Sequence, residues 1–196
     1  MGELIRLLIA GYFVTLPVLG FLVALVLVVA GPRPITAARV YDTLLRQFLL
    51  FGIGLAYFTN FIFHSFFGDL AAELIGWTDS PFQFEVGVAS LGFSLVGFYA
   101  LRRDNGVRFA ALLGTAAFVW GAAVGHIVQI VVAGNFAPGN AGFMLYADIA
   151  LPAIGFLLLW LAARHPLPDP PAGPEQSDRS TTARLRPATS REGVRR

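Results

Sequence analysis

Long apolar segments alternate with short polar ones along most of the chain. A helix of about 20 apolar residues crosses a bilayer, and the apolar segments run over residues 5–30, 41–67, 82–101, 107–133 and 141–163. The polar stretch after the second segment contains a short apolar run, 70–75, which predicts a helix at the membrane interface. The pattern predicts an all-α fold, a polytopic transmembrane helical bundle of about five spans over residues 1–164.

The first apolar segment resembles a signal peptide only superficially. It is longer than the apolar core of a signal peptide, which has about 7–15 residues, so we expect a retained helix. Pro17 lies within it and leaves the carbonyl of Phe13 without its helical partner.

The composition supports a membrane protein and changes character after the last apolar segment. Hydrophobic residues make up 56% of the 196 residues and charged residues only 13%, whereas about a quarter are charged in soluble domains. Residues 165–196 are mostly Pro, Arg, Ser, Thr and acids, which predicts a disordered tail. The expected partner is therefore the lipid bilayer, and the sequence is compatible with a homo-oligomer or a larger membrane complex. It does not suggest a nucleic-acid partner.

The distribution of arginines predicts the orientation of the spans. All 14 basic residues are Arg, and they concentrate in segments 33–39 and 102–108 and in the tail, whereas the loops after the second and fourth spans have none. Because basic loops stay on the cytoplasmic side, we expect a multi-pass protein of the inner (plasma) membrane with its N-terminus outside and its C-terminus in the cytoplasm. Arg6 alone argues against this orientation.

A helix start signal precedes the third span. Ser80 is a favourable N-cap, Pro81 suits the first helical position, and Gln83 follows Ser80 at the spacing of a capping box. Glu85 then lies about one turn inside the membrane helix, where an acid is costly and usually has a partner or a function.

Two glycine-containing motifs in the C-terminal half predict local packing. Gly121 and Gly125 form a small-xxx-small pair that would let another helix approach closely. Pro138 and Gly139 are typical of a type II turn, and Asn140 after them is a candidate cap of the fifth span.

Polar residues from four spans fall at a similar depth in the predicted outer half of the bilayer. At about 1.5 Å per residue, each lies within a few turns of the predicted outer end of its helix. The residues in this set are Asn60, His64, Glu85, His126, Gln129 and Asp148. Pro152 also frees the carbonyl of Asp148, so this residue offers a carboxylate and an unpaired backbone oxygen. We therefore predict a shared polar pocket that faces the outer side.

Each of these residues also has a structural interpretation. His64 suits a hydrogen-bonded interfacial position, and Glu85 can extend to the headgroups. Asn60, Gln129 and Asn140 are typical of polar contacts that hold membrane helices together. Absence of Cys excludes a thiol redox relay, a disulfide and Cys-ligated zinc or iron–sulfur clusters.

Three classes of function remain open, and the sequence does not decide whether the protein is an enzyme. In the first, His64, Glu85, His126 and Asp148 bind a divalent metal ion such as zinc, iron or manganese, or act as acid–base groups beside a quinone or another small redox substrate. A haem between His64 and His126 is a less favoured variant. The second class is a small proton- or ion-coupled transporter, and the third is an accessory or structural membrane subunit.

Two motifs carry a resemblance to a known group of proteins. They are Pro-Phe-Gln-Phe-Glu-Val-Gly at 81–87 and Ala-Gly-Asn-Phe-Ala-Pro-Gly-Asn-Ala-Gly at 133–142. With them, residues 45–163 resemble a family of small prokaryotic integral membrane proteins of unknown function, which implies a helical bundle in the inner membrane and no particular activity. A looser similarity, of size and helix number, is to DoxX-like four-helix membrane proteins, some of which are associated with quinone-linked oxidoreductases.

Overall fold

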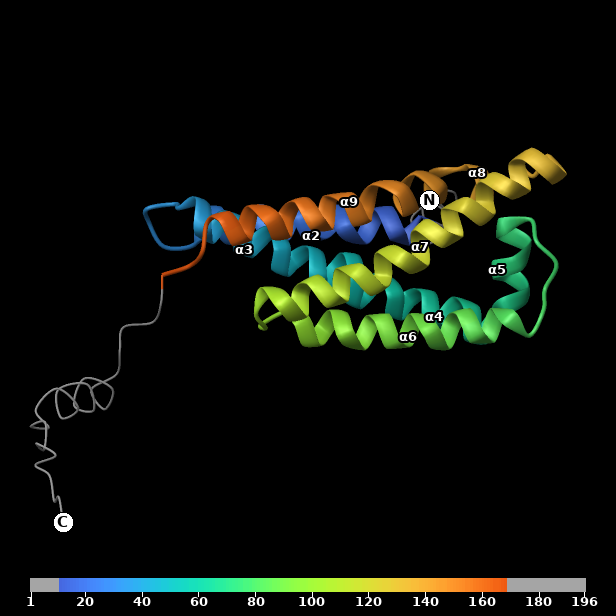
Figure 1. Cartoon of the computed structure of the whole chain (residues 1–196), viewed down its shortest axis with the longest axis horizontal. Coiled ribbons are helices and arrows are strands. Elements are labelled where there is room, and N and C mark those ends of the chain that lie inside the picture. Colours follow the sequence, from blue (N-terminus) through green and yellow to red (C-terminus); the bar gives the residue numbers. More distant parts are fainter. Residues whose placement is uncertain (1–10, 169–196) are drawn as a thin grey trace, which may run out of the picture. The chain divides into compact units, whose positions relative to one another are not determined.

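The computed structural model describes residues 11–168, and within them the regular structure is entirely helical (Figure 1). Five helical stretches are long and apolar enough to cross a membrane, which confirms the predicted fold class and identifies a multi-pass membrane protein. The helices are α2 (Tyr12–Ala30), α3 (Ala37–Gln47), η1 (Phe48–Leu55), α4 (Ala56–Phe66), α5 (Gly68–Ile75), α6 (Phe82–Ala100), α7 (Asn105–Ala133), α8 (Pro138–Ala141) and α9 (Phe143–Arg164). Residues 5–10 of the predicted first span and 169–196 of the predicted tail lie outside the described residues.

The second span is built from three of these elements in succession. α3, η1 and α4 follow one another without a break over Ala37–Phe66. The central element, η1, is π-helical, a conformation that is rare and often marks a functional site. The short helix predicted at 70–75 is present as α5.

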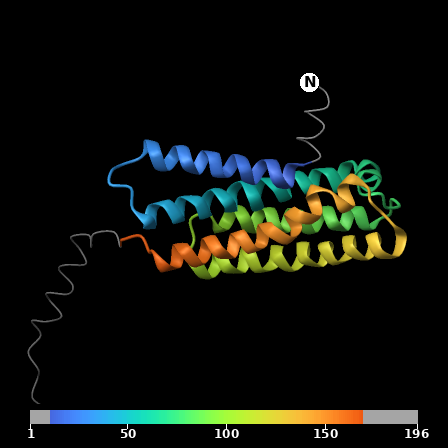
Figure 2. The ribbon, with the colours of Figure 1, turned by 90° about the horizontal axis from the view of Figure 1, so that it is seen from above.

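Two helix pairs and a flanking helix make up the bundle. α4 packs along α6, α7 packs along α9, and α2 lies against α3 and η1 at one side (Figure 2). α6 and α7 are close at the turn that joins them and then diverge, and α5 lies across the end where they are far apart (Figure 1). We call this the α5 end; α4 and α7 end there, and α6, α8 and α9 begin there.

The observed N-caps of the helices differ from the predicted one. No side chain caps the first turn of α6, so the predicted capping box of Ser80 and Gln83 is wrong. Gln83 is 9% exposed and bonds His64 instead. α7 is capped by Asp104, whose carboxylate accepts hydrogen bonds from the amides of Gly106 and Val107 at 2.8 and 3.2 Å. These bonds, that of Val107 above all, hold the pKa of Asp104 below its usual value.

A close contact between two helices occurs at Gly97 and not at the predicted pair of Gly121 and Gly125. A Cβ at Gly97 of α6 would come within 2.7 Å of the Ile53 side chain and 2.9 Å of the Gly54 amide nitrogen, and Ser94 donates a 2.8 Å hydrogen bond to the Gly54 carbonyl. By contrast, no heavy atom lies within 4 Å of a Cβ at Gly121. Within the described residues, no helix therefore makes a close approach at Gly121.

The loop between α7 and α9 contains a short helix in place of the predicted type II turn. Pro138 and Gly139 open the short helix α8, and Gly139 lacks the positive φ that a type II turn requires, since the described glycines with positive φ are Gly76 and Gly134. Asn140 is fully buried and does not cap α9, for which no side-chain cap is present.

Arginines gather at the end of the bundle opposite to α5. Those in the described range lie in the loop after α2, in α3, around the α6–α7 turn and at the end of α9. At this end Asp42 forms ion pairs with Arg46 at 2.7 Å and with the buried Arg108 at 2.9 Å, which joins α3 to α7 and gives a guanidinium inside the bundle a counter-charge.

Candidate functional site

A cavity of about 350 Å³ lies at the α5 end of the bundle. It occupies the space between the diverging helix pairs, and α5 with the loop that follows it forms part of the wall. Each helix contributes one face: Asn60, Phe63 and His64 from α4, Gln83 and Val86 from α6, Val119, Ala122 and His126 from α7, and Met144 and Asp148 from α9. The volume falls at the lower end of the range of small-molecule sites.

The orientation of His126 is fixed by Asn140. The Asn140 amide nitrogen donates to the backbone carbonyls of Asn135 at 2.9 Å and of His126 at 3.2 Å, which determines how the amide is turned. Its oxygen then lies 2.7 Å from Nδ1 of His126 and can only accept, so Nδ1 carries the proton. In the neutral imidazole, Nε2 is therefore an acceptor.

Asp148 lies beside this acceptor nitrogen. Its Oδ2 is 3.7 Å from Nε2 of His126, which is longer than a hydrogen bond. The residue is 6% exposed, and no other described side chain or amide donates to its carboxylate within hydrogen-bond distance. Asp148 and His126 thus form a pair of acceptors that lie at the cavity wall without a donor between them.

Two further polar groups connect helices around the cavity. Nδ1 of His64 lies 2.5 Å from Oε1 of Gln83, which joins α4 to α6. The Tyr12 hydroxyl donates to Oδ1 of Asn60, whose amide nitrogen donates to Ser90 at 2.7 Å. These two hydrogen bonds join α2, α4 and α6 and satisfy the side-chain amide of the buried Asn60.

Most of the remaining wall is aromatic or aliphatic. The indole of Trp77 lies against the ring of His126 with 5.5 Å between ring centroids, and Tyr12 stacks on Phe63 at 5.7 Å. Among the described lining residues, Asp148 is the only carboxylate, and none is Arg or Lys. The site is thus apolar, with a few polar groups that can orient a ligand.

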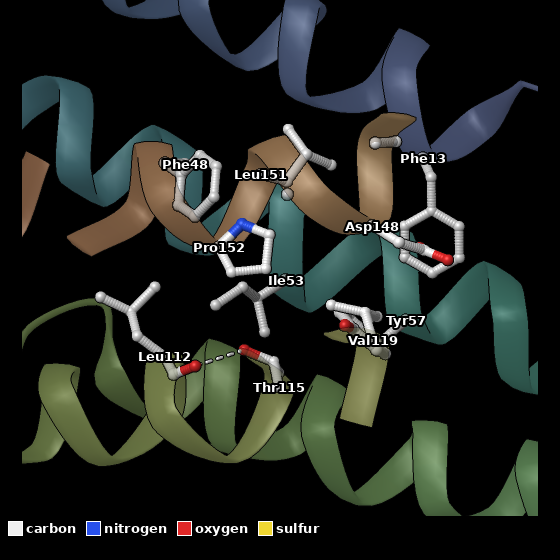
Figure 3. Close-up of a pocket in the computed structure, with 12 residues that line it drawn as sticks. Phe13, Phe48, Ile53, Tyr57, Leu112, Thr115, Val119, Asp148, Leu151 and Pro152 are labelled. Carbon is white, nitrogen blue, oxygen red and sulfur yellow. Dashed lines mark hydrogen bonds between the residues drawn. The ribbon is translucent and has the colours of Figure 1, made fainter. Parts of the chain in front are cut away.

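Asp148 also lines a second, water-sized cavity of about 20 Å³ (Figure 3). Its wall includes Phe48, Gly52 and Ile53 of η1, Thr115 of α7, and Pro152, one turn after Asp148 on α9. Thr115 donates to carbonyls of its own helix at 3.0 and 3.1 Å. Three departures from a regular helix therefore surround the small cavity beside Asp148. They are the π-helical segment, the proline inside α9 and the hydrogen bonds from the Thr115 side chain to its own helix.

The predicted pocket residues divide into two groups. Asn60, His64, His126 and Asp148 line the cavity, whereas Glu85 and Gln129 do not. Glu85 is exposed, because the buried face of α6 runs through Gln83, Gly87 and Ser90 and Glu85 lies about 200° around the helix from Gln83. Gln129 lies about one turn beyond His126 on α7.

The positions of His64, Glu85, His126 and Asp148 bear on the predicted metal site. Within residues 11–168, no group of three or more His, Asp or Glu side chains is arranged to hold a metal ion. Of the predicted ligands, His126 and Asp148 lie near each other, but the 3.7 Å between Nε2 and Oδ2 is longer than a hydrogen bond.

Sequence analysis missed the roles of several site residues. The sequence predicts a cap at Gln83 and a cap or packing contact at Asn140, whereas both bond histidines of the cavity, and no prediction covers Tyr12. A signal for Gln83 was present, since it falls on the stripe of small residues Gly87, Ser90, Ser94 and Gly97 that marks the buried face of α6. No comparable signal pointed to Asn140, because its partner His126 lies on a different helix.

The model of a family described as of unknown function, DUF6790, matches residues 10–168, and a similarity to DoxX-like proteins is not shown. No curated protein and no solved structure gave a match.

Proposed function

The chain belongs to the DUF6790 family of unknown function, and from this premise we propose a function on the geometry of the site. The protein binds a small, largely apolar molecule in the cavity at the α5 end. The polar group of this molecule faces His126 and Asp148, and its apolar part packs on the aromatic wall.

One observation carries this proposal. A 350 Å³ cavity is lined on one side by an imidazole whose tautomer is fixed and by a carboxylate that lacks a donor. Buried polar groups of a membrane protein are costly unless they are paired. A ligand with hydrogen-bond donors provides the missing partners, and the cavity provides the space for it.

A pair of substitutions at adjacent positions on α7 tests the proposal. Ala122 lines the cavity, so Ala122→Phe fills it, whereas a side chain at Gly121 meets open space. The probes are 2-naphthylmethylamine and its neutral isostere 2-naphthylmethanol, measured by equilibrium dialysis against the full chain in phosphatidylcholine nanodiscs, with empty nanodiscs subtracted.

We expect at least one probe to bind the unchanged protein and Gly121→Phe alike, and to lose about tenfold or more in affinity for Ala122→Phe. Thermal unfolding of both variants shows that they are folded. If neither probe binds the unchanged protein, or if both variants bind equally, the cavity is not a ligand site and the proposal fails.

A second function is favoured by a separate observation. The pairs His64–Gln83, Tyr12–Asn60 and His126–Asn140 each join different elements, as polar contacts do when they hold membrane helices together. In this alternative the protein is an accessory or structural membrane subunit without a site of its own. It predicts that substitutions in these pairs change stability and leave no binding activity to lose.

We also propose that the protein lies in the inner (plasma) membrane with its α5 end outside. The arginine-rich end of the bundle then faces the cytoplasm, in agreement with the rule that positive loops stay inside. The cavity consequently faces the outer side.

A further inference from the structure

We infer that the ligand of this cavity is an organic cation, a primary ammonium group carried on an apolar, preferably aromatic body. This inference rests on the proposed function and names the chemical class of its ligand. Three features of the wall lead to it: the unpaired acceptors, the sign of the charge and the aromatic rings.

The acceptors at His126 and Asp148 call for a group with several donors. Asn140 holds the proton of neutral His126 on Nδ1 and so turns the lone pair of Nε2 toward Asp148. The separation of 3.7 Å leaves Nε2 and the Asp148 carboxylate without a hydrogen bond between them. A primary ammonium has three donors, so it can donate one hydrogen bond to the carboxylate and another to Nε2 from a single position.

The charge of the wall selects a cation over an anion. Among the described lining residues Asp148 is the single carboxylate, and no Arg or Lys accompanies it. Burial of a carboxylate that is 6% exposed costs free energy of desolvation unless a counter-charge accompanies it. An ammonium supplies the charge, a neutral alcohol supplies only a hydrogen bond, and an anion meets repulsion.

The aromatic part of the wall favours the same class. Trp77 lies against the ring of His126, and Phe63 and Phe118 line the same cavity. Aromatic faces attract ammonium groups, more strongly where water is excluded, and they also pack well on an aromatic body. The charged group and the apolar body of the ligand thus both find complementary surfaces.

The test compares the two probes already named, which differ in charge at nearly constant shape. At pH 7 2-naphthylmethylamine is a cation and 2-naphthylmethanol is neutral. Nanodiscs of zwitterionic phosphatidylcholine limit non-specific attraction of the cation to lipid, and empty nanodiscs correct for partitioning. We expect the amine to bind at least tenfold more tightly than the alcohol.

Two acidic positions provide a matched pair of variants. Asp148→Asn preserves size and removes the charge, and it should reduce affinity for the amine about tenfold or more while affinity for the alcohol changes less than about twofold. Glu85→Gln removes an acid at the same end of the bundle that is exposed and does not line the cavity, and it should leave both affinities unchanged. Retained binding of the alcohol shows that Asp148→Asn is folded.

The possible results separate the two proposals. Equal affinity for amine and alcohol, both lost in Ala122→Phe, overturns the cation inference and supports the binding function; His126 would then already neutralise Asp148. A preference for the amine that persists in Asp148→Asn also overturns the inference. Absence of binding by either probe overturns the binding function itself.

Discussion

At the scale of single residues, the two histidines of the cavity are held by the same kind of contact. Nδ1 of His64 lies against the Gln83 amide oxygen and Nδ1 of His126 against the Asn140 amide oxygen. The two contacts differ in one respect. The Asn140 amide nitrogen donates to two backbone carbonyls, whereas no such bond of Gln83 is found among the described residues. The tautomer is therefore fixed at His126 and not at His64.

Replacing Asn140 by Leu should release the tautomer of His126. Leu has a similar size but no acceptor, so the proton is no longer held on Nδ1, and the buried donor left unpaired costs about 1–3 kcal/mol of stability. The measurement is the ¹⁵N shift of the two ring nitrogens of His126 in the labelled protein, with a melting curve for stability.

Gln83→Leu serves as the control, because it removes the corresponding contact of His64. It should alter the signals of His64 and leave those of His126 unchanged. Unchanged His126 signals in Asn140→Leu would show that Asn140 does not set the tautomer.

At the scale of elements, the cavity exists because two pairs of helices diverge. The contact between η1 and α6 is close, since Gly97 and the Ser94 hydrogen bond bring the backbones together. From the α6–α7 turn, α7 leans away from α6 toward α9 (Figure 1). The helices thus pack tightly between Asp148 and the end opposite to α5. Between Asp148 and the α5 end they leave a cavity, which α5 closes in part.

Matched Gly→Ala substitutions test which glycines carry this packing. At Gly97 the added methyl group meets atoms at 2.7 and 2.9 Å, and forcing extra volume into a packed contact costs about 1–3 kcal/mol. At Gly121 it meets open space, and Ala is better than Gly in a helix interior by up to about 1 kcal/mol.

Thermal unfolding in detergent should therefore show a lower midpoint for Gly97→Ala and an equal or higher one for Gly121→Ala. A lower midpoint for Gly121→Ala would mean that another surface packs on this face, such as a second copy of the chain. Equal midpoints for both variants would contradict the close η1–α6 contact.

At the scale of the whole molecule, charge is divided between the two ends of the bundle. The described arginines lie at the end opposite to α5, whereas Asp69, Glu73 and Asp79 lie in or next to α5. The membrane orientation that we propose follows from this separation.

Single cysteines test the orientation directly, because the natural chain has none. Asp79→Cys places an exposed thiol at the α5 end, and Arg102→Cys places one at the opposite end. In intact cells, a membrane-impermeant maleimide should label Asp79→Cys and not Arg102→Cys, and both should react after permeabilisation. The reverse pattern would place the cavity on the cytoplasmic side.

The sequence by itself determined the number and approximate position of the spans and the helix at 70–75. These features depend on local hydrophobicity and length, which are read along the chain. Helical periodicity alone also places Asn60 and His64, four residues apart, on one side of their helix. The family model matches residues 10–168 and assigns no activity.

Only the tertiary structure decided which polar residues meet. Depth in the membrane placed Glu85 beside His64, but depth does not fix rotation about the helix axis, and the packing of α6 on α4 turns Glu85 outward. The contacts of His126 with Asn140 and of His64 with Gln83 bridge elements whose relative rotation and height no local pattern encodes. The cavity, likewise, arises from the divergence of helix pairs, which is a property of their packing and not of any one segment.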